Sequence, residues 1–359
     1  MKVFTLFVEP AAYTLDLIKN VHHKLGISHA YLHSSSVASD QTNMPDAATT
    51  RYFDQHSFFS NLSFLWKCTR NHQLIIVNGY NHSSFIFLWI FGMLNSCCIG
   101  IESDTPLQKR HGIIALLKSA YLKLIFSPSH VLGLPGGNGK HYDLFAHYGM
   151  AENRIFLLPM MVDNAKYFKE LPPGQPTPPQ LVRFLCVARL APEKNIPLLI
   201  AAFKELVKQY QNVQLDLVGD GPSRTALEEL ITDSPQIKLH GKKFGAALLQ
   251  FYKDSHVLVL PSAFEPWGLV VNEAMAAGLA VICSDQVGAA YDLLSRTHTG
   301  WIFESNNQQD LTATLVNLLQ NPHQIYSSGK SAQEFMMSHW NYKRYTDSLN
   351  QIFSYVKHP

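Results

Sequence analysis

The feature that most constrains the fold of this chain is a regular alternation of apolar runs and helical patterns through its second half. This alternation predicts βαβ units arranged around a parallel sheet. Because runs such as HVLVL are continuously apolar, we expect strands that are buried on both faces between layers of helices. The predicted strands are residues 183–189, 213–219, 237–241, 256–262 and 280–284, and the predicted helices are 197–210, 223–231, 246–253, 268–277 and 309–319.

The first half repeats the pattern less regularly, and a proline-rich segment separates the two halves. Residues 170–180, ELPPGQPTPPQ, contain five prolines, which are typical of a semi-rigid linker. A chain of 359 residues is long enough for two domains. We predict a first domain over residues 1–170, a linker over 171–180, a second domain over 181–337, and a terminal helix over about 338–359 that packs back on the first domain. Predicted strands of the first half are residues 3–8, 29–33, 74–77, 97–101, 122–126 and 155–158.

Composition excludes several classes of protein. The 29 basic and 27 acidic residues nearly cancel, which argues against a nucleic-acid-binding protein. The five cysteines are scattered without a C-x-x-C pair, so we expect buried thiols and neither a disulfide scaffold nor a zinc site. The uncharged segment 83–101 favours a buried helix followed by a strand over a membrane span. Buried thiols indicate a reducing compartment, so we expect a cytoplasmic protein.

Two glutamates in the segment SAFEPWGLVVNEAMAAG carry the strongest functional signal. Glu265 and Glu273 lie eight residues apart, on either side of the start of a predicted helix near Gly268. The free N–H groups of Gly268, Leu269 and Val270 would form an anion site at the helix N-terminus. A diphosphate on these amides, a ribose on Glu273 and a sugar near Glu265 fit this layout. The alternative is that both glutamates are solvated surface acids.

Further candidates follow other predicted strands of the second half. Arg189 and Lys194 stand in RLAPEKN after the first of these strands, where two cations can bind a diphosphate and stabilise a departing phosphate. Gly219 belongs to a tight VGDGP turn after the next strand, and Lys242 stands in HGKK after the third. A single cation is commonly an ordinary surface residue, but a pair of cations after a buried strand is less often so, and the VGDGP and HGKK segments are weak signals by themselves.

Together these segments resemble the retaining, nucleotide-sugar-dependent enzymes of glycosyltransferase family 4. RLAPEKN, VGDGP, HGKK, LPSAFEPWGLVVNEAMAAG and TGWIFE stand in the family's order between residues 181 and 303. The resemblance implies a GT-B fold of two facing Rossmann-like domains with parallel sheets and an interdomain cleft. It implies a donor held by the second domain, and neither a metal nor another cofactor. Arg189 and Lys194 would then bind the diphosphate, Glu273 the ribose and Glu265 the transferred sugar.

The acceptor is expected on the first domain. Candidates are Tyr13 in the loop after the first strand, Glu102 and Asp104 in the segment GIESDTP, and His111. The spacing of Glu102 and Asp104 resembles a metal-binding D-x-D pair, but no second cluster of ligands accompanies it, so an acceptor contact is the better interpretation. The apolar and basic segment 109–126 is either a buried helix leading into a strand or a surface that docks on anionic lipid headgroups.

The resemblance therefore implies an enzyme that moves a sugar with retention, without a metal, to a hydroxyl of a glycan or lipid-linked acceptor. Its expected role is the synthesis of a cell-surface polysaccharide or lipopolysaccharide, in the cytoplasm or at the inner face of the membrane. One alternative is another GT-B enzyme, an epimerase or a phosphorylase. The other is a nucleotide-sugar-binding protein without activity, because Ala11, Ala12 and Tyr13 replace the glycine pair that many family members carry there.

Overall fold

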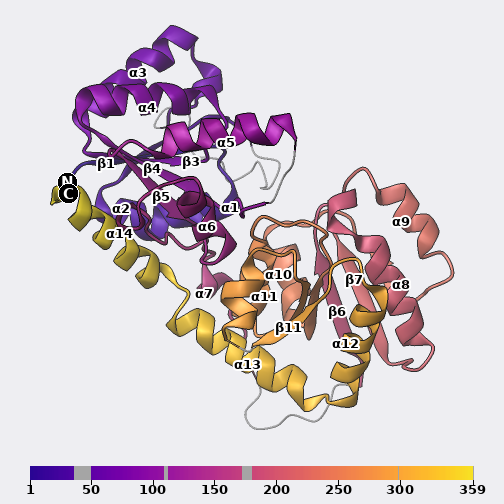
Figure 1. Ribbon diagram of the computed structural model, residues 1–359. Helices are drawn as coiled ribbons and strands as arrows, with labels where there is room; N and C mark the ends of the chain where they lie inside the picture. Colours follow the sequence, from indigo (N-terminus) through magenta and orange to yellow (C-terminus); the bar gives the residue numbers. More distant parts are fainter. Residues whose placement is uncertain (36–49, 109–111, 172–179, 298, 359) are drawn as a thin grey trace. The chain divides into compact units, whose positions relative to one another are not determined.

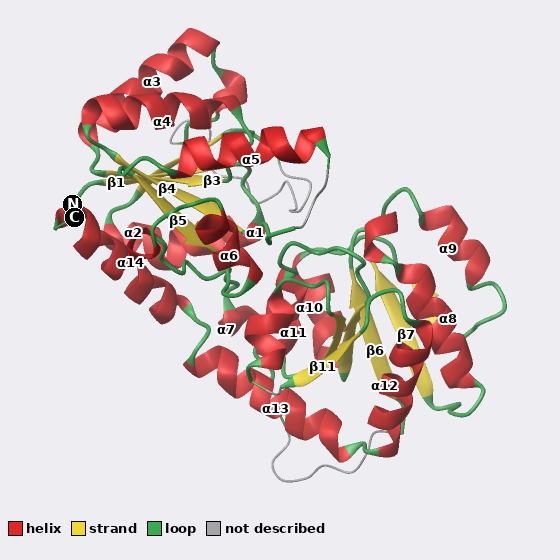
Figure 2. Ribbon diagram, in the orientation of Figure 1, coloured by secondary structure: helices red, strands yellow, loops and turns green. Residues whose placement is uncertain are grey.

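The computed structural model of the chain describes residues 1–35, 50–108, 112–171, 180–297 and 299–358. It comprises two compact units, Met1–Met161 with Tyr342–Pro359, and Val162–Asn341. Each unit contains one sheet, of five and of six strands, in which all strands are parallel. Figure 1 and Figure 2 show helices on both sides of each sheet. The predicted α/β class with two parallel sheets is confirmed.

The first unit is built on a sheet with the strand order β2-β1-β3-β4-β5. Helices α3, α4 and α5 cover one side of it, and α2 and α14 lie on the other side (Figure 2). Strands β1, β3 and β5 are almost completely buried, as layers of helices on both sides require. The elements of this unit are β1 Val3–Phe7, α1 Ala12–Leu17, η1 Ile18–His22, α2 His23–Leu25, β2 Ser28–Tyr31, η3 Phe53–Gln55, α3 Phe58–Asn71, β3 Leu74–Asn78, α4 Ser83–Asn95, β4 Cys98–Ser103, α5 Ile113–Phe126, β5 Val131–Pro135, α6 Lys140–His147, η4 Glu152–Arg154 and α14 Tyr342–Lys357.

The second unit is built on a sheet with the order β11-β10-β9-β6-β7-β8. Helices α8, α9 and α12 share one hydrophobic core with its strands, in which Phe184 and Phe203 pack edge to face. Helix α11 packs on α13 and on β9 and β10. The elements of this unit are α7 Asn164–Tyr167, β6 Val182–Val187, η5 Pro192–Lys194, α8 Ile196–Val207, β7 Val213–Val218, α9 Arg224–Leu230, β8 Ile237–Leu239, α10 Gly245–Asp254, β9 Val257–Leu260, α11 Leu269–Ala276, β10 Ala280–Ser284, η6 Ala290–Ser295, β11 Gly300–Phe303, α12 Gln308–Gln320 and α13 His323–Ser338.

Two predicted strands of the first half are wrong. Residues 122–126 form the last turns of α5, and 155–158 form no strand, although Ile155 makes a single bridge to Gly133. Leu122, Ile125 and Phe126 are buried at helical spacing, so a short apolar run was mistaken for a strand. The fifth strand of the sheet is β5, and the edge strand β11 of the second unit was not predicted either.

The boundary between the units falls before the predicted linker. Residues 162–171 group with the second unit, where the side-chain amide of Asn164 donates to the carbonyl oxygens of Met336 and Trp340 at 2.8 and 2.9 Å. The predicted linker 171–180 lies almost entirely outside the described residues. Helix α14 groups with the first unit, where it contacts η1 and Tyr355 packs against Phe156.

Segment 83–101 forms helix α4 and the beginning of strand β4. Across the described ranges, no helix combines the length and the apolar character that crossing a membrane would require. All five cysteines are free thiols, and four of them are buried; Cys98 is partly exposed.

Candidate functional site

The predicted donor residues of the second unit lie at the edge of its sheet where the strand order reverses. The chain runs outward from β6 through β7 to β8, and then returns to place β9 on the other side of β6. The loops that follow β6 and β9 therefore leave the carboxyl edge of the sheet side by side, the usual place for a ligand in open α/β sheets. Backbone amides of Ala263 and Phe264 donate to the carbonyl oxygen of Glu193 and join the two loops.

Lys194 and Glu265 meet at this edge. Lys194 ends the short helix η5 after β6, and its Nζ lies 2.6 Å from Oε2 of Glu265 in the loop after β9. The side chains are 16% and 14% exposed, so the pair is largely screened from water. Ser262 Oγ donates to the same carboxylate oxygen at 3.4 Å. The structure thus brings together two predicted site residues that are 71 positions apart in the sequence.

The first turn of α11 adjoins this ion pair. Helix α11 begins at Leu269, and its N-cap residue Gly268 has a φ of +94°, a conformation that favours glycine. A side chain at Gly268 would also come within 3.1 Å of Cγ of Glu265. The amides of Leu269 and Val270 belong to the turn whose N–H groups have no partner inside a helix. This geometry suits an anion next to the Lys194–Glu265 pair.

Glu273 lies further along α11 and contacts two tyrosines. Its Oε1 accepts a hydrogen bond from the Tyr167 hydroxyl at 3.0 Å, and its Oε2 accepts one from Tyr252 at 2.5 Å. Burial raises the pKa of Glu273, while the two hydrogen bonds act in the opposite direction. These contacts connect α11 with α7 and α10. The binding of a ribose by Glu273 stays a prediction, and the tyrosines give this carboxylate a structural role as well.

The remaining donor candidates surround this edge. The Arg189 side chain is exposed and forms no ion pair with any residue that the structure describes. Gly219 allows a close approach of two loops, because a Cβ there would lie 1.8 Å from the carbonyl oxygen of Ala188. Lys242 follows the edge strand β8, and its ammonium group lies 4.6 Å from the centre of the Phe244 ring. Their contacts with a donor stay predictions.

A second candidate site lies in the first unit, again where the strand order of the sheet reverses. The chain leaves β1 for β2 on one side, and β3 then pairs with the other side of β1. A pocket of about 380 Å³ opens there, at the carboxyl edge of β1, β3 and β4. Three predicted acceptor-side residues, Tyr13, Glu102 and Asp104, line it. The fourth, His111, lies outside the described residues.

We refer to this pocket as the β1–β3 pocket. The ionisable groups that line it, Tyr13, Glu102 and Asp104, have raised pKa values. Burial raises the pKa of Glu102 to about 7, and the neighbouring Asp104 carboxylate adds to the shift. The pKa of Asp104 is raised as well by burial, and burial together with the two carboxylates raises that of Tyr13. Glu102 therefore changes charge near neutral pH, where a carboxyl can accept or donate a proton.

Sequence reasoning missed three residues of these sites. Asn78, at the end of β3, donates from Nδ2 to Oε2 of Glu102 at 2.6 Å, while its buried Oδ1 has no hydrogen-bond partner within the described ranges. Its position at the end of a predicted strand was the signal that could have found it. Tyr167 and Tyr252 lie 106 and 21 positions from Glu273 in the sequence, and no local sequence pattern predicts that they contact it. Within the same ranges, no group of three or more His, Cys, Asp or Glu side chains could hold a metal ion.

Two curated proteins match parts of this chain. The sulfoquinovosyl transferase SQD2 of Arabidopsis thaliana is 30% identical over 204 residues, which are 54% of this chain and 38% of that protein. The alpha-monoglucosyldiacylglycerol synthase of Acholeplasma laidlawii is 32% identical over 152 residues, 42% of this chain and 37% of that protein. The chain thus spans less than two fifths of the length of these two curated relatives.

Comparison of structures extends over the whole chain. The crystal structure of Anabaena HepE in complex with UDP matches with a TM-score of 0.72 and 16% identity, covering 99% of this chain and 100% of that one. This likeness confirms the predicted GT-B fold class. Residues 168–335, which carry Lys194, Glu265 and Glu273, match the family model described as glycosyl transferases group 1.

Proposed function

We propose that the chain is a glycosyltransferase that moves a sugar from a nucleoside-diphosphate sugar to a hydroxyl of a glycan or lipid-linked acceptor. The observation that carries this proposal is the meeting of Lys194, Glu265 and the first turn of α11 at one sheet edge. That edge lies in the segment similar to glycosyl transferases group 1. The names of the relatives, a sulfoquinovosyl transferase and a monoglucosyldiacylglycerol synthase, and the UDP bound by HepE support it.

The donor diphosphate would lie on the amides of Gly268, Leu269 and Val270. Arg189 supplies an exposed positive charge, and the Lys194 ammonium has two further N–H donors besides the one that Glu265 accepts. Glu265 thereby holds the ammonium in place, and it would also contact the transferred sugar. A cation fixed before the reaction stabilises the charge that develops on the departing diphosphate without reorganisation.

The transfer itself exchanges one bond for another at the anomeric carbon. The bond from this carbon to the diphosphate oxygen breaks, and its electron pair leaves with the diphosphate. The acceptor oxygen forms its bond to the same face of the carbon, so that the configuration is retained, and its proton passes to the departing phosphate. In this scheme the protein positions the reactants and stabilises charge, and neither a metal nor another cofactor takes part.

The acceptor hydroxyl would enter the β1–β3 pocket. The unpartnered Oδ1 of Asn78 can accept a hydrogen bond from it, and Glu102 and Asp104 offer further acceptors. We also propose that the product is a cell-surface polysaccharide or lipopolysaccharide that is made at the inner face of the membrane. Support for this role comes from three segments, VNGYNHSSF, GIESDTP and AHYGMAENRIFLLPMMVDNAKYF, which resemble the amino-terminal half of some bacterial members of glycosyltransferase family 4.

The test is a screen of nucleotide sugars against the full chain. Calorimetry with UDP, GDP and ADP identifies the nucleotide, and release of that nucleoside diphosphate from its sugar donors then measures turnover. We expect binding by one nucleotide, turnover with at least one donor, and loss of turnover in Glu265→Ala. Nucleotide binding without turnover of any donor, with or without candidate acceptors, would leave a binding protein without activity. An epimerase would instead give a new nucleotide sugar and no free diphosphate.

A further inference from the structure

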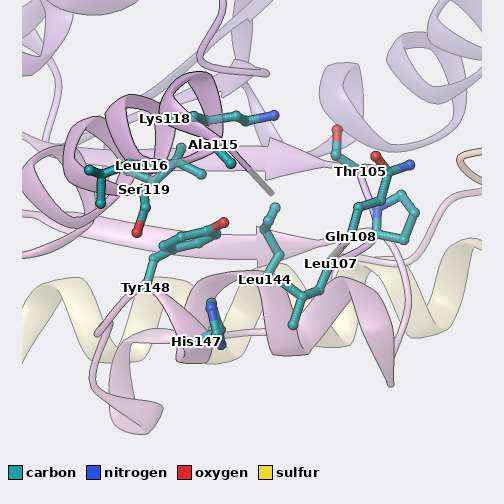
Figure 3. A pocket seen from close by; sticks show the side chains of 13 residues that line it. Thr105, Leu107, Gln108, Ala115, Leu116, Lys118, Ser119, Leu144, His147 and Tyr148 are labelled. Carbon is teal, nitrogen blue, oxygen red and sulfur yellow. The ribbon is translucent and has the colours of Figure 1, made fainter. Parts of the chain in front are cut away.

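The first unit contains a second pocket that the proposed reaction has not used. It has a volume of about 520 Å³ and lies between α5 and α6. Leu107, Leu116, Leu122 and Leu144 supply apolar walls, and Figure 3 shows Lys118 extending along one edge. We refer to it as the α5–α6 pocket. Apolar atoms make up most of its walls and can hold a hydrocarbon chain, beside the polar side chains of Gln108, Ser119, His147 and Tyr148.

This apolar pocket adjoins the polar β1–β3 pocket. Thr105 lines both of them, three residues after Glu102 and one after Asp104. A ligand that spans the two pockets would place hydroxyl groups beside Asn78, Glu102 and Asp104, and an apolar segment beside the leucines. That combination describes an amphiphile with a hydroxylated head and a hydrocarbon tail.

The outer face of α5 is apolar and exposed. Ile113, Leu117 and Leu124 follow one another at helical spacing and are 61–75% exposed, in contrast to Leu122, Ile125 and Phe126, which face the core. The helix is held firmly by its C-terminal end. The buried guanidinium of Arg154 donates to the carbonyl oxygens of Phe126 and Ser127, each at 3.2 Å. An exposed apolar stripe of this kind is typical of a helix that lies in a membrane interface.

The charges of the surrounding layer complement an anionic surface. Helices α3, α4 and α5, which stack on the same side of the sheet (Figure 2), carry Lys67, Arg70, Lys118 and Lys123. They contain no Asp or Glu over lengths of 14, 13 and 14 residues, although the chain has 27 acidic residues. Phe59 in α3 and Leu94 in α4 are exposed apolar side chains as well. Cations without acids beside exposed apolar groups are attracted to anionic headgroups.

We infer that the acceptor is a membrane lipid with a hydroxylated head, and that the protein binds it while docked on an anionic bilayer through α5. The head lies in the β1–β3 pocket, the chain enters the α5–α6 pocket, and the outer stripe of α5 inserts among the headgroups. This inference rests on the proposed function, because it identifies the acceptor of that reaction.

Docking is tested by flotation of the full chain with vesicles. Wild type should float with equal parts of phosphatidylglycerol and phosphatidylcholine, remain unbound with phosphatidylcholine alone, and dissociate in high salt. Leu117→Glu should reduce binding at least about tenfold, since it places a charge in the inserted stripe. Leu230→Glu, at an exposed leucine of the second unit, is the matched control and should bind like wild type. Absence of binding by wild type, or equal binding by both variants, would overturn the docking surface.

The α5–α6 pocket is tested separately by calorimetry with octyl glucoside below its micelle concentration and with methyl glucoside. The octyl chain should improve affinity at least about tenfold, because seven additional carbons leave water. Ala115→Phe fills the pocket and should abolish this advantage without changing the affinity for methyl glucoside or the melting temperature. If the chain length has no effect in wild type, the pocket does not bind lipid. These titrations contain no nucleotide, so their failure is distinguishable from a failure to bind UDP, GDP or ADP, which would count against the proposed function.

Discussion

Replacing Glu273 by alanine separates its two roles, the predicted contact with a ribose and the observed contacts with tyrosines. The substitution removes the acceptor of both hydroxyl hydrogen bonds, from Tyr167 at 3.0 Å and from Tyr252 at 2.5 Å. Tyr252 is completely buried, so its hydroxyl would remain without a partner inside the protein. Stability and nucleotide affinity should therefore both change, for different reasons.

The loss of stability follows from these contacts. A buried hydroxyl left without a partner costs about 1–3 kcal/mol, and Tyr167, which is partly exposed, adds less because water can reach it. Removal of a buried carboxylate offsets part of the loss, since burial raises the pKa of Glu273 and therefore disfavours its charged form. We expect the free energy of unfolding to fall by about 2–3 kcal/mol. If Glu273 also binds the ribose, nucleoside diphosphate should bind roughly ten- to a hundredfold more weakly.

Urea unfolding and calorimetry with the preferred nucleoside diphosphate measure the two quantities on each variant. Tyr252→Phe is the matched control, because it removes one hydrogen bond and leaves the carboxylate; stability should fall by about 1–2 kcal/mol while nucleotide affinity stays. Glu265→Ala should likewise keep nucleotide affinity and lose turnover. A Glu273→Ala variant that is destabilised but binds nucleotide normally refutes the ribose contact and leaves only the structural role.

Three further outcomes are expected. Lys194→Met should lower the free energy of unfolding by about 2 kcal/mol and weaken nucleotide binding about tenfold, because Glu265 loses its partner at 2.6 Å; adding Glu265→Gln should restore stability but not binding. The free energy of unfolding of wild type should fall by about 3 kcal/mol as the pH rises from about 4.5 to 7, because the Glu102 carboxyl stays protonated there in the folded state but not in the unfolded state. Glu102→Gln should abolish this fall, and urea titrations at several pH values measure it. Gly219→Ala should lower stability by about 3 kcal/mol in the same assay, since the new Cβ meets the carbonyl oxygen of Ala188, and an unchanged value would contradict the close approach.

The parts of the fold that could be predicted are those in which a buried element appears in the sequence as a short apolar run with polar or turn residues at its ends. The predicted strand over residues 280–284 coincides with β10, because a glycine precedes its apolar residues and the polar Ser284 and Asp285 follow them. The prediction failed at residues 122–126, where an apolar run ends a helix whose outer face is itself apolar. Periodicity distinguishes a helix from a strand only when one face is polar, and α5 exposes Ile113 and Leu117 as well as burying Leu122.

The candidate sites, too, have a part that the sequence predicts and a part that only the packing of the fold shows. Spacing along the sequence indicated that Lys194 and Glu265 follow strands, and strand order then places both at one sheet edge. It could not predict that the two side chains pair with each other, since that depends on the pairing of β6 with β9. The hydroxyls that contact Glu273 come from α7 and α10, which only the packing of the second unit brings to α11.

Helix α14 has a consequence for the synthesis of the chain. It completes the first unit, where Tyr345, Leu349 and Ile352 are buried, yet residues 342–357 are translated after the whole second unit. During translation the second unit can fold as soon as its last helix has left the ribosome, whereas the first unit waits with the surface for α14 uncovered. The first unit is therefore the first to be translated and the last to complete its fold. Slow elongation would lengthen the time during which its uncovered apolar surface can aggregate.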